Sequence, residues 1–202
     1  MAVSEVQIAK LALQHLGDRY DITSLDEFSP EAEQVNLVFA NVRDALLREH
    51  PWKFSLRYVS PSNLIGTPPA GWTYMYQYPP DALKVWRIVN PIDPQNNELD
   101  PLPFTIARNS NDVKVLLSNE STPEFEYTQQ VTNSFDFDAH FDMALSWKIA
   151  ELIAIPITGD TAIRDRVQRD AANAVALAKQ EDGNEGISRK QTRDPDWMRA
   201  RL

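Results

Sequence analysis

Apolar residues recur at helical spacing near both ends of the chain and at alternating spacing in its middle. After Ser29 they fall three and four residues apart, at Val35, Val38, Phe39, Val42, Ala45 and Leu46. Ser29 offers an oxygen to cap the helix, Pro30 stands where no N–H is needed, and Pro51 disfavours the helical conformation of the residue before it. The pattern predicts one long amphipathic helix that ends just before Pro51.

Two further segments have helical spacing. A short helix is expected between Ser4 and Gly17, where Ser4 and Gln7 can form a capping box and the glycine ends the helix. Another should follow Asp138 and continue to about Ile155, where a proline follows. This second segment is apolar most of the way round, so we expect it to be the central helix of the fold.

A last helix is expected from about Ile163 to Gly183. One of its faces is an alanine-rich stripe that permits close contact with another helix. The opposite face is charged and consists of Arg164, Asp165, Arg166, Arg169 and Asp170. Such a face meets either solvent or a neighbouring subunit, and our hypothesis is a subunit interface.

Between the helical segments the spacing changes to two. Phe54, Leu56 and Tyr58 alternate with polar residues, and so do Tyr74, Tyr76 and Tyr78, and Phe125 and Tyr127. Further strands are expected at 83–89, 104–107 and 113–117. Most of the 14 prolines lie between Pro61 and Pro123, which suits the edges and loops of a small antiparallel sheet.

These elements predict an α+β fold. The N- and C-terminal segments, residues 1–51 and 137–186, are expected to form a four-helix bundle domain. An antiparallel β-rich domain, residues 52–136, is inserted between them. Residues 187–202 have no periodicity and are expected to form an extended C-terminal docking tail.

Charge is distributed unevenly along the chain. The 202 residues carry a formal charge of -9, which argues against a protein that holds nucleic acid by its phosphates. Residues 187–202 contain five basic and two acidic side chains, so the tail is +3 and the rest of the chain -12. A basic tail on an acidic body is typical of a segment that docks on an acidic neighbour.

Few residues suggest catalysis. There are no cysteines and only six glycines, and neither a phosphate loop nor a common hydrolase motif is present. No apolar run of membrane length and no secretory leader are found, so we expect no membrane association. We expect the three histidines to be structural and the protein to bind no cofactor.

The sharpest group of chemical side chains is Asp136, Asp138, His140 and Asp142. Alternating carboxylates with an imidazole could hold a divalent cation, so a small metal-dependent hydrolase is the alternative enzyme hypothesis. The glycine and later glutamate of an EF-hand are missing, and aspartates before a helix favour a capping role. We therefore expect no catalytic or metal site.

Aromatic residues gather in the strand region, at Trp52, Trp72, Tyr74, Tyr76, Tyr78 and Trp86. They could form a platform for stacking single-stranded bases, but basic residues are not interleaved with them densely enough. Packing within the sheet and contact between subunits use the same residue types. We favour these two roles over base stacking.

Several short segments, in order, resemble those of a known family. They are the first helix ending Leu16-Gly17, Ile22-Thr23-Ser24-Leu25, residues 45–54, residues 78–85, and Trp197-Met198-Arg199-Ala200-Arg201. Together they resemble the head-to-tail adaptors of tailed bacteriophages, the tail tubular protein A family of short-tailed phages. The similarity runs over nearly the whole chain.

The resemblance implies a structural virion protein and not an enzyme. Family members form twelve-fold rings between the portal protein and the tail nozzle or tail tube, and double-stranded DNA passes through the ring. On this interpretation the residues that dock on the portal are Arg189, Lys190, Arg193, Trp197, Arg199 and Arg201. A tail-completion or tube component of a longer-tailed phage is the alternative.

Overall fold

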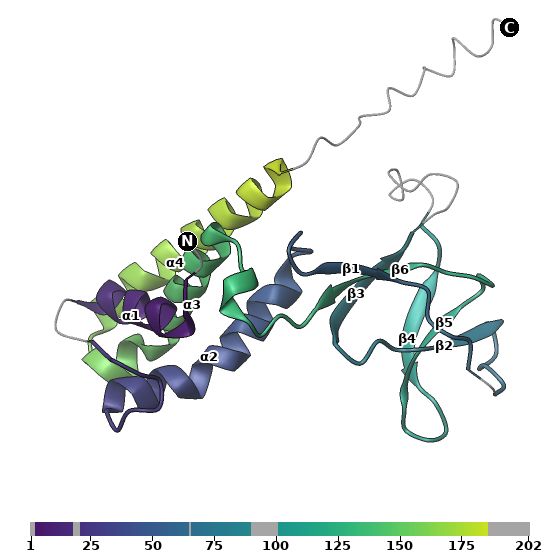
Figure 1. Ribbon diagram of the computed structural model, residues 1–202, viewed down its shortest axis with the longest axis horizontal. Helices are drawn as coiled ribbons and strands as arrows, with labels where there is room; N and C mark the ends of the chain where they lie inside the picture. Colours follow the sequence, from purple (N-terminus) through teal and green to yellow (C-terminus); the bar gives the residue numbers. More distant parts are fainter. Residues whose placement is uncertain (1–2, 18–20, 65, 90–100, 186–202) are drawn as a thin grey trace, which may run out of the picture.

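The computed structural model describes residues 3–17, 21–64, 66–89 and 101–185. In this part of the chain two helices precede the strands and two follow them (Figure 1). The helices are α1 (Glu5–Leu16), α2 (Pro30–Glu49), α3 (Ala139–Thr158) and α4 (Thr161–Asn184), with a short 3-10 turn η1 (Ser134–Asp136) before α3. None of the helices in these ranges combines the length and apolar character needed to cross a membrane.

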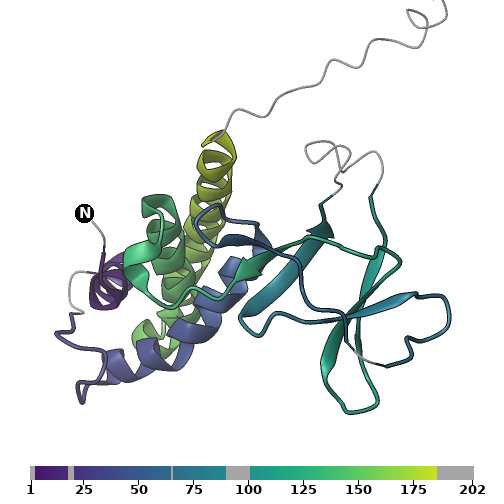
Figure 2. The ribbon, with the colours of Figure 1, turned by 45° about the vertical axis from the view of Figure 1, so that its right-hand side comes forward.

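The strands form two antiparallel sheets of three strands each in the described chain. The strands are β1 (Leu56–Val59), β2 (Tyr74–Gln77), β3 (Ala82–Ile88), β4 (Phe104–Arg108), β5 (Lys114–Ser118) and β6 (Phe125–Gln129). One sheet has the order β1-β6-β3 and the other β2-β5-β4. The α+β class is therefore confirmed, with two small sheets where the sequence suggested one. Figures 1 and 2 show the strands on one side of the molecule and the helices on the other.

The predicted helix starts are confirmed because they depend on local hydrogen bonds. Ser4 and Gln7 form a complete capping box, and the Ser29 hydroxyl accepts the amide of Ala32. Asp138 caps α3 by accepting the amide of His140 at 2.8 Å. Each bond satisfies an amide that the first helical turn leaves free.

The end of α3 differs from the prediction. The helix passes through Pro156 and ends at Thr158. The Thr158 hydroxyl donates to the Ala154 carbonyl at 2.7 Å, and the Gly159 amide donates to the Ile155 carbonyl at 2.9 Å. Gly159 has φ 66°, a left-handed conformation in which glycine is favoured. These bonds sustain the last turn beyond the proline.

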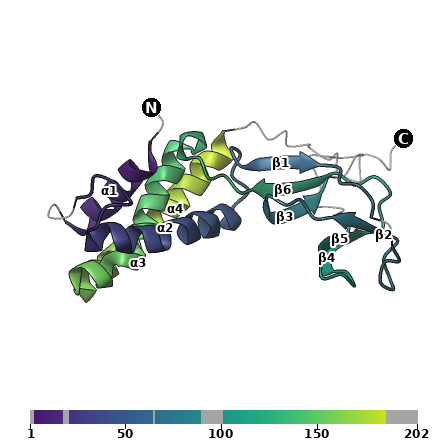
Figure 3. The same cartoon turned by 60° about the horizontal axis from the view of Figure 1, so that its bottom comes forward.

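The predicted four-helix bundle is wrong. In a bundle, four helices of similar length surround a common axis and each packs against two neighbours. Here α3 packs against α1, α2 and α4, while α1 touches α4 only slightly. The 12 residues of α1 are half the 24 of α4, so α1 cannot form a full side of a bundle. The helices are grouped around α3 as a hub (Figure 3).

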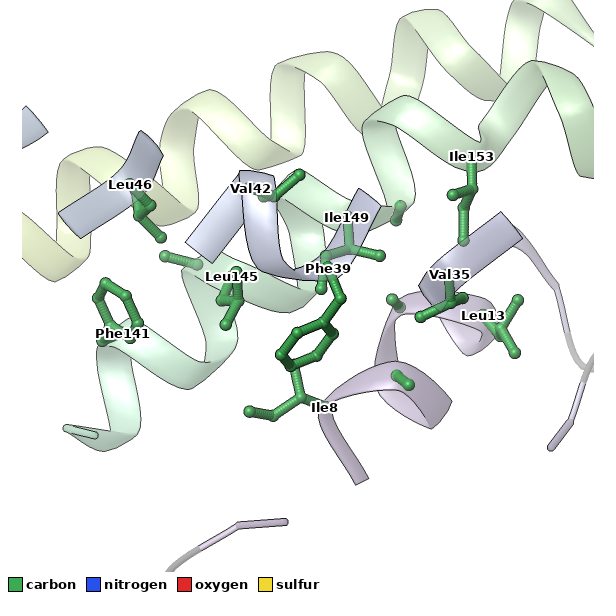
Figure 4. Close-up of a cluster of buried hydrophobic side chains, with 14 of the residues drawn as sticks. Ile8, Leu13, Val35, Phe39, Val42, Leu46, Phe141, Leu145, Ile149 and Ile153 are labelled. Atoms are coloured by element: carbon green, nitrogen blue, oxygen red, sulfur yellow. The ribbon is translucent and has the colours of Figure 1, made fainter. Parts of the chain in front are cut away.

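The hub arrangement follows from the composition of α3. Phe141, Leu145, Ile149 and Ile153 are all at most 1% exposed, and Figure 4 shows them in a row facing α1 and α2. Small residues Ala144, Ala150 and Ala154 are also fully buried, on other sides of the same helix. A helix that is apolar most of the way round needs neighbours on several sides.

The strand region has its own core. Phe125 of β6 is fully buried and lies edge to face with Tyr76 of β2 and Phe104 of β4. These contacts pack one sheet against the other through a cluster separate from the helical one. The division into domains stays a prediction, and the proposed tail lies outside the described residues.

Some charged and polar side chains are buried in this fold. Arg43 of α2 is 7% exposed, and its Nε contacts Asp44 at 2.9 Å. In β6, Glu126 and Thr128 are buried, as are the aromatic residues Phe125 and Tyr127 with which they alternate. This follows because β6 is the central strand of its sheet and both its faces are covered.

Candidate interaction surfaces

Some residues on the charged face of α4 contact other parts of the fold, and others are exposed to solvent. Arg166 donates from its guanidinium to the His15 carbonyl at 2.7 Å, and half-buried Asp170 lies near the same histidine. Arg164 pairs with the adjacent Asp165 at 2.6 Å, and both are exposed. Arg169 is exposed and has no hydrogen bond or ion pair with the described residues. The predicted interface thus retains exposed charges, and Arg166 ties α4 to α1.

A recess lies where the end of α1 meets the start of α4. Its walls include His15, Leu16, Trp147, Ile163, Arg166 and Asp170, and its volume is about 460 Å³. The rings of His15 and Trp147 stack at 3.5 Å between centroids with 7° between their planes. Burial lowers the pKa of His15 to about 4, with Asp170 opposing and Arg166 adding to the shift. The imidazole is therefore neutral at pH 7, and the recess has an aromatic wall with a cation at its edge. We call it the α1/α4 recess.

The neighbours of His15 look like a serine-based catalytic group but do not have the required geometry. Its Nε2 lies 3.1 Å from the Ser146 hydroxyl, and Asp170 is nearby. Ser146 is 0% exposed, and its hydroxyl donates to the Met143 carbonyl at 2.8 Å. A nucleophile must reach its substrate, so the arrangement is structural. No sequence pattern could indicate this contact, because His15 and Ser146 are 131 residues apart.

Two of the aspartates at the start of α3, Asp136 and Asp138, make hydrogen bonds to nearby residues of the chain. Asp138 caps the helix and Asp136 accepts a bond from Asn133 at 3.2 Å, while His140 is exposed. Asp142 is 5% exposed, and its Oδ1 has no hydrogen-bond partner among the described residues. In the described part of the chain, no three His, Asp or Glu side chains are grouped so that they could hold a metal ion. The hydrolase hypothesis gains no support from this geometry.

The C-terminal turn of α4 is anchored at the junction between helices and strands. Asp182 is 9% exposed, and its carboxylate accepts bonds from His50 Nε2 and from the Lys53 amide, each at 2.9 Å. The Lys53 ammonium donates to the Asp182 carbonyl. Trp52 is 1% exposed, and its indole N–H donates to the Leu46 carbonyl at 2.9 Å. The segment that leaves α2 is thus held by both α2 and α4.

The loop between α1 and α2 presents a fully exposed aromatic ring. Phe28 is 110% exposed relative to its reference state, more than any other large hydrophobic residue described. Beside it, the Glu27 carboxylate accepts bonds from the Thr23 amide, the Thr23 hydroxyl and the Ser29 hydroxyl, at 2.6 to 2.8 Å. Hydrogen bonds from Thr23, then Ser29, lower the pKa of Glu27 to about 2. We call residues 21–29 the knob loop.

The aromatic residues of the strand region are mostly used in packing. Tyr76 is 1% and Tyr78 9% exposed. Half-buried Trp86 donates its indole N–H to the Thr128 hydroxyl at 2.7 Å, and the Lys84 ammonium lies 3.4 Å from the centre of its ring. Buried faces cannot stack on bases, so these contacts favour the packing interpretation.

The segments that carry the family resemblance occupy structural positions. Residues 45–54 end α2 and form the junction with Trp52, and Ile22 is 1% exposed. The portal-docking residues predicted from the sequence, from Arg189 to Arg201, lie outside the described residues. No protein-family model matches this chain, and no curated protein matches it.

Proposed function

We propose that the protein is a head-to-tail adaptor, a structural virion protein whose copies form a ring between the portal vertex and the tail. The observation that carries the proposal is the anchored end of α4. Asp182 fixes the last turn of this helix to the junction segment, immediately before the basic residues 187–202 begin. A helix held in this way is a firm base from which a terminal segment can bind another protein.

The distribution of charge supports the same role. The described body belongs to the acidic part of the chain, and the terminal segment carries +3. We propose that this segment binds an acidic surface of the portal protein, with Trp197 and the arginines as its contacts. The exposed charges of α4 and the knob loop remain for neighbouring copies of the chain, and the tail nozzle or tube binds elsewhere on the ring.

An acidic body also suits a wall past which DNA moves. Carboxylates repel the phosphate backbone, whereas a basic lining would bind it strongly and in a salt-dependent way. The formal charge of -9 therefore favours transient passage of double-stranded DNA over stable binding.

The proposal can be tested with phage heads that lack this protein. Heads filled with DNA are mixed with the full-length chain or with a chain that ends at residue 186. The full chain should attach to the portal vertex as a ring visible by electron microscopy, and the shortened chain should stay unattached while circular dichroism shows it folded. A full-length chain with Lys148→Ala and Glu151→Ala, which removes a surface ion pair on α3, is the control that should attach.

Two outcomes would contradict the proposal. If the full chain does not bind at the portal vertex, the adaptor assignment fails. If electron microscopy of virions finds the protein along the tail tube, it is a tail component. Attachment of the shortened chain would remove only the docking role of residues 187–202.

A further inference from the structure

The knob loop has the structure of a contact site. Its exposed Phe28 stands between Glu27, which braces the loop, and Ser29, which caps α2. Because Glu27 holds both ends of the loop, little conformational freedom remains to be lost when the ring is buried. A large apolar side chain on a braced and fully exposed support is a typical anchor of a protein interface.

The surroundings of the ring are acidic. Asp26, Glu27, Glu31 and Glu33 lie in the loop or in the first turn of α2, and Asp26, Glu27 and Glu33 line the same surface hollow as Phe28. None of these four carboxylates has an ion pair with a described basic residue. A partner for the knob loop must therefore offer an apolar or aromatic recess with positive charge at its edge.

The α1/α4 recess of the same chain combines an aromatic wall with a cation at its edge, in a lining that is otherwise largely polar. The stacked His15 and Trp147 rings form its wall, and the half-buried Ile163 adds apolar surface. Arg166 lies at its edge, and Arg169 follows three residues later on the same helical face. Of the acidic groups there, Asp165 pairs with Arg164, while Asp170 lines the recess beside the neutral His15.

We propose that the knob loop of one copy docks in the α1/α4 recess of the next copy, with Phe28 against the His15–Trp147 wall and the carboxylates of the loop near Arg166 and Arg169. This inference deepens the subunit interface of the proposed ring and rests on that proposal. The two surfaces are different, so the contact is heterologous: each copy gives its knob to one neighbour and its recess to another. Heterologous contacts continue from copy to copy and close into a ring when the rotation allows it.

The absence of cysteine from the chain permits a clean cross-linking test. Asp26→Cys places a thiol beside the knob, and Gln14→Cys places one at the edge of the recess, where Gln14 is exposed. The full-length double variant is treated with a short bis-maleimide, both as purified protein at high concentration and in particles that contain it. We expect a ladder of linked oligomers, because each copy is joined to two neighbours.

Matched variants separate docking from random collision. Phe28→Ser in the double-cysteine chain should reduce linked product about tenfold, because the anchor that leaves water is lost. Leu37→Ser, which removes a 69% exposed residue of α2, should leave the ladder unchanged. A chain in which Asn41→Cys, on the exposed side of α2, replaces Asp26→Cys should give no ladder.

Three cross-linking results would contradict part or all of this inference. No ladder in solution or in particles, or a ladder that Phe28→Ser leaves intact, would overturn the inference. A product that stops at the dimer would overturn the heterologous contact in favour of a two-fold pair. If the ladder forms but the protein is absent from virions, the knob contact is supported and the adaptor function is rejected. If the protein is found at the portal vertex but no ladder forms, the adaptor function is supported and the knob contact is rejected.

Discussion

Asp142 is a buried carboxyl whose ionised form this fold disfavours. Burial, and then repulsion from Asp138, raise the pKa of its carboxyl from 3.8 to about 7. Between pH 3.8 and about pH 7, therefore, this carboxyl is protonated in the folded protein and ionised in the unfolded chain. Stability from this group is present at low pH and is lost as pH rises toward 7.

Asp142→Asn should make this dependence visible. The amide has the shape of the carboxyl and no charge, so the variant should gain about 2 kcal/mol more over the wild type at pH 8 than at pH 5. Urea unfolding at the two pH values measures the difference. Asp136→Asn, at an exposed carboxyl, is the control. An equal effect of Asp142→Asn at both pH values would show that the buried carboxyl does not titrate in this range.

His15 acts in the opposite direction. Its pKa is lowered from 6.5 to about 4, so the unfolded chain binds the extra proton and stability is lost as pH falls from 6.5 toward 4. The wild-type pH profile therefore combines two opposed contributions. Comparing Asp142→Asn with the wild type at each pH removes the His15 contribution, because it is common to both proteins.

Glu27 controls the shape of the knob loop. Its pKa of about 2 means that the carboxylate stays ionised and keeps its hydrogen bonds until the pH is far below its usual value of 4.5. Glu27→Ala should free the amides of Thr23 and Ser24, and hydrogen exchange should report their faster exchange. Asp26→Ala, one residue earlier and with an exposed side chain, should leave both amides protected. Unchanged protection in Glu27→Ala would mean that other contacts brace the loop.

At the scale of elements, Asp182 joins α4 to the end of α2. Asp182→Ala leaves His50 Nε2 and the Lys53 amide without their acceptor, and we expect a loss of about 2 to 3 kcal/mol in the free energy of unfolding. Chemical denaturation measures this loss. The exposed Glu185→Ala at the same helix end should change stability by less than about 0.5 kcal/mol. Equal effects of the two variants would show that the anchor contributes little.

The helix starts were predictable from the sequence, and the packing of the helices was not. Ser4, Ser29 and Asp138 accept hydrogen bonds from amides within three residues of their own positions. The local sequence is therefore enough to predict where each helix starts. The hub around α3 depends on which helix covers each of its sides. Periodicity identified α3 as central but could not distinguish a hub from a closed bundle.

The same limit explains the interaction surfaces. The charges of α4 could be recognised as a face, but its link to α1 through Arg166 and His15 joins residues 151 positions apart. Phe28 looks like a core residue in sequence because apolar residues are usually buried. In the structure it is fully exposed, in the loop that Glu27 braces by bonds to Thr23 and Ser29.

At the scale of the whole molecule, the described chain holds two main cores that share no residues. The helical core surrounds α3 and includes Trp52, and the strand core lies between the two sheets. Contact between the two regions is limited chiefly to α2 with β3 and the junction segment (Figures 1 and 3). Cores that are packed separately can open separately.

We therefore expect the helical and strand regions to respond independently to damage. Phe125→Ala, which empties a site between the sheets, should cost about 3 to 5 kcal/mol and speed hydrogen exchange in β5 and β6 but not in α3. Leu145→Ala in α3, fully buried like Phe125, should cost about 2 to 5 kcal/mol and have the reverse pattern. If either variant accelerates exchange in both regions, the junction around Trp52 and Asp182 couples them into one cooperative unit. Independent responses would mean that the strand region can be altered for contact with a tail partner without weakening the helices that we propose form the ring.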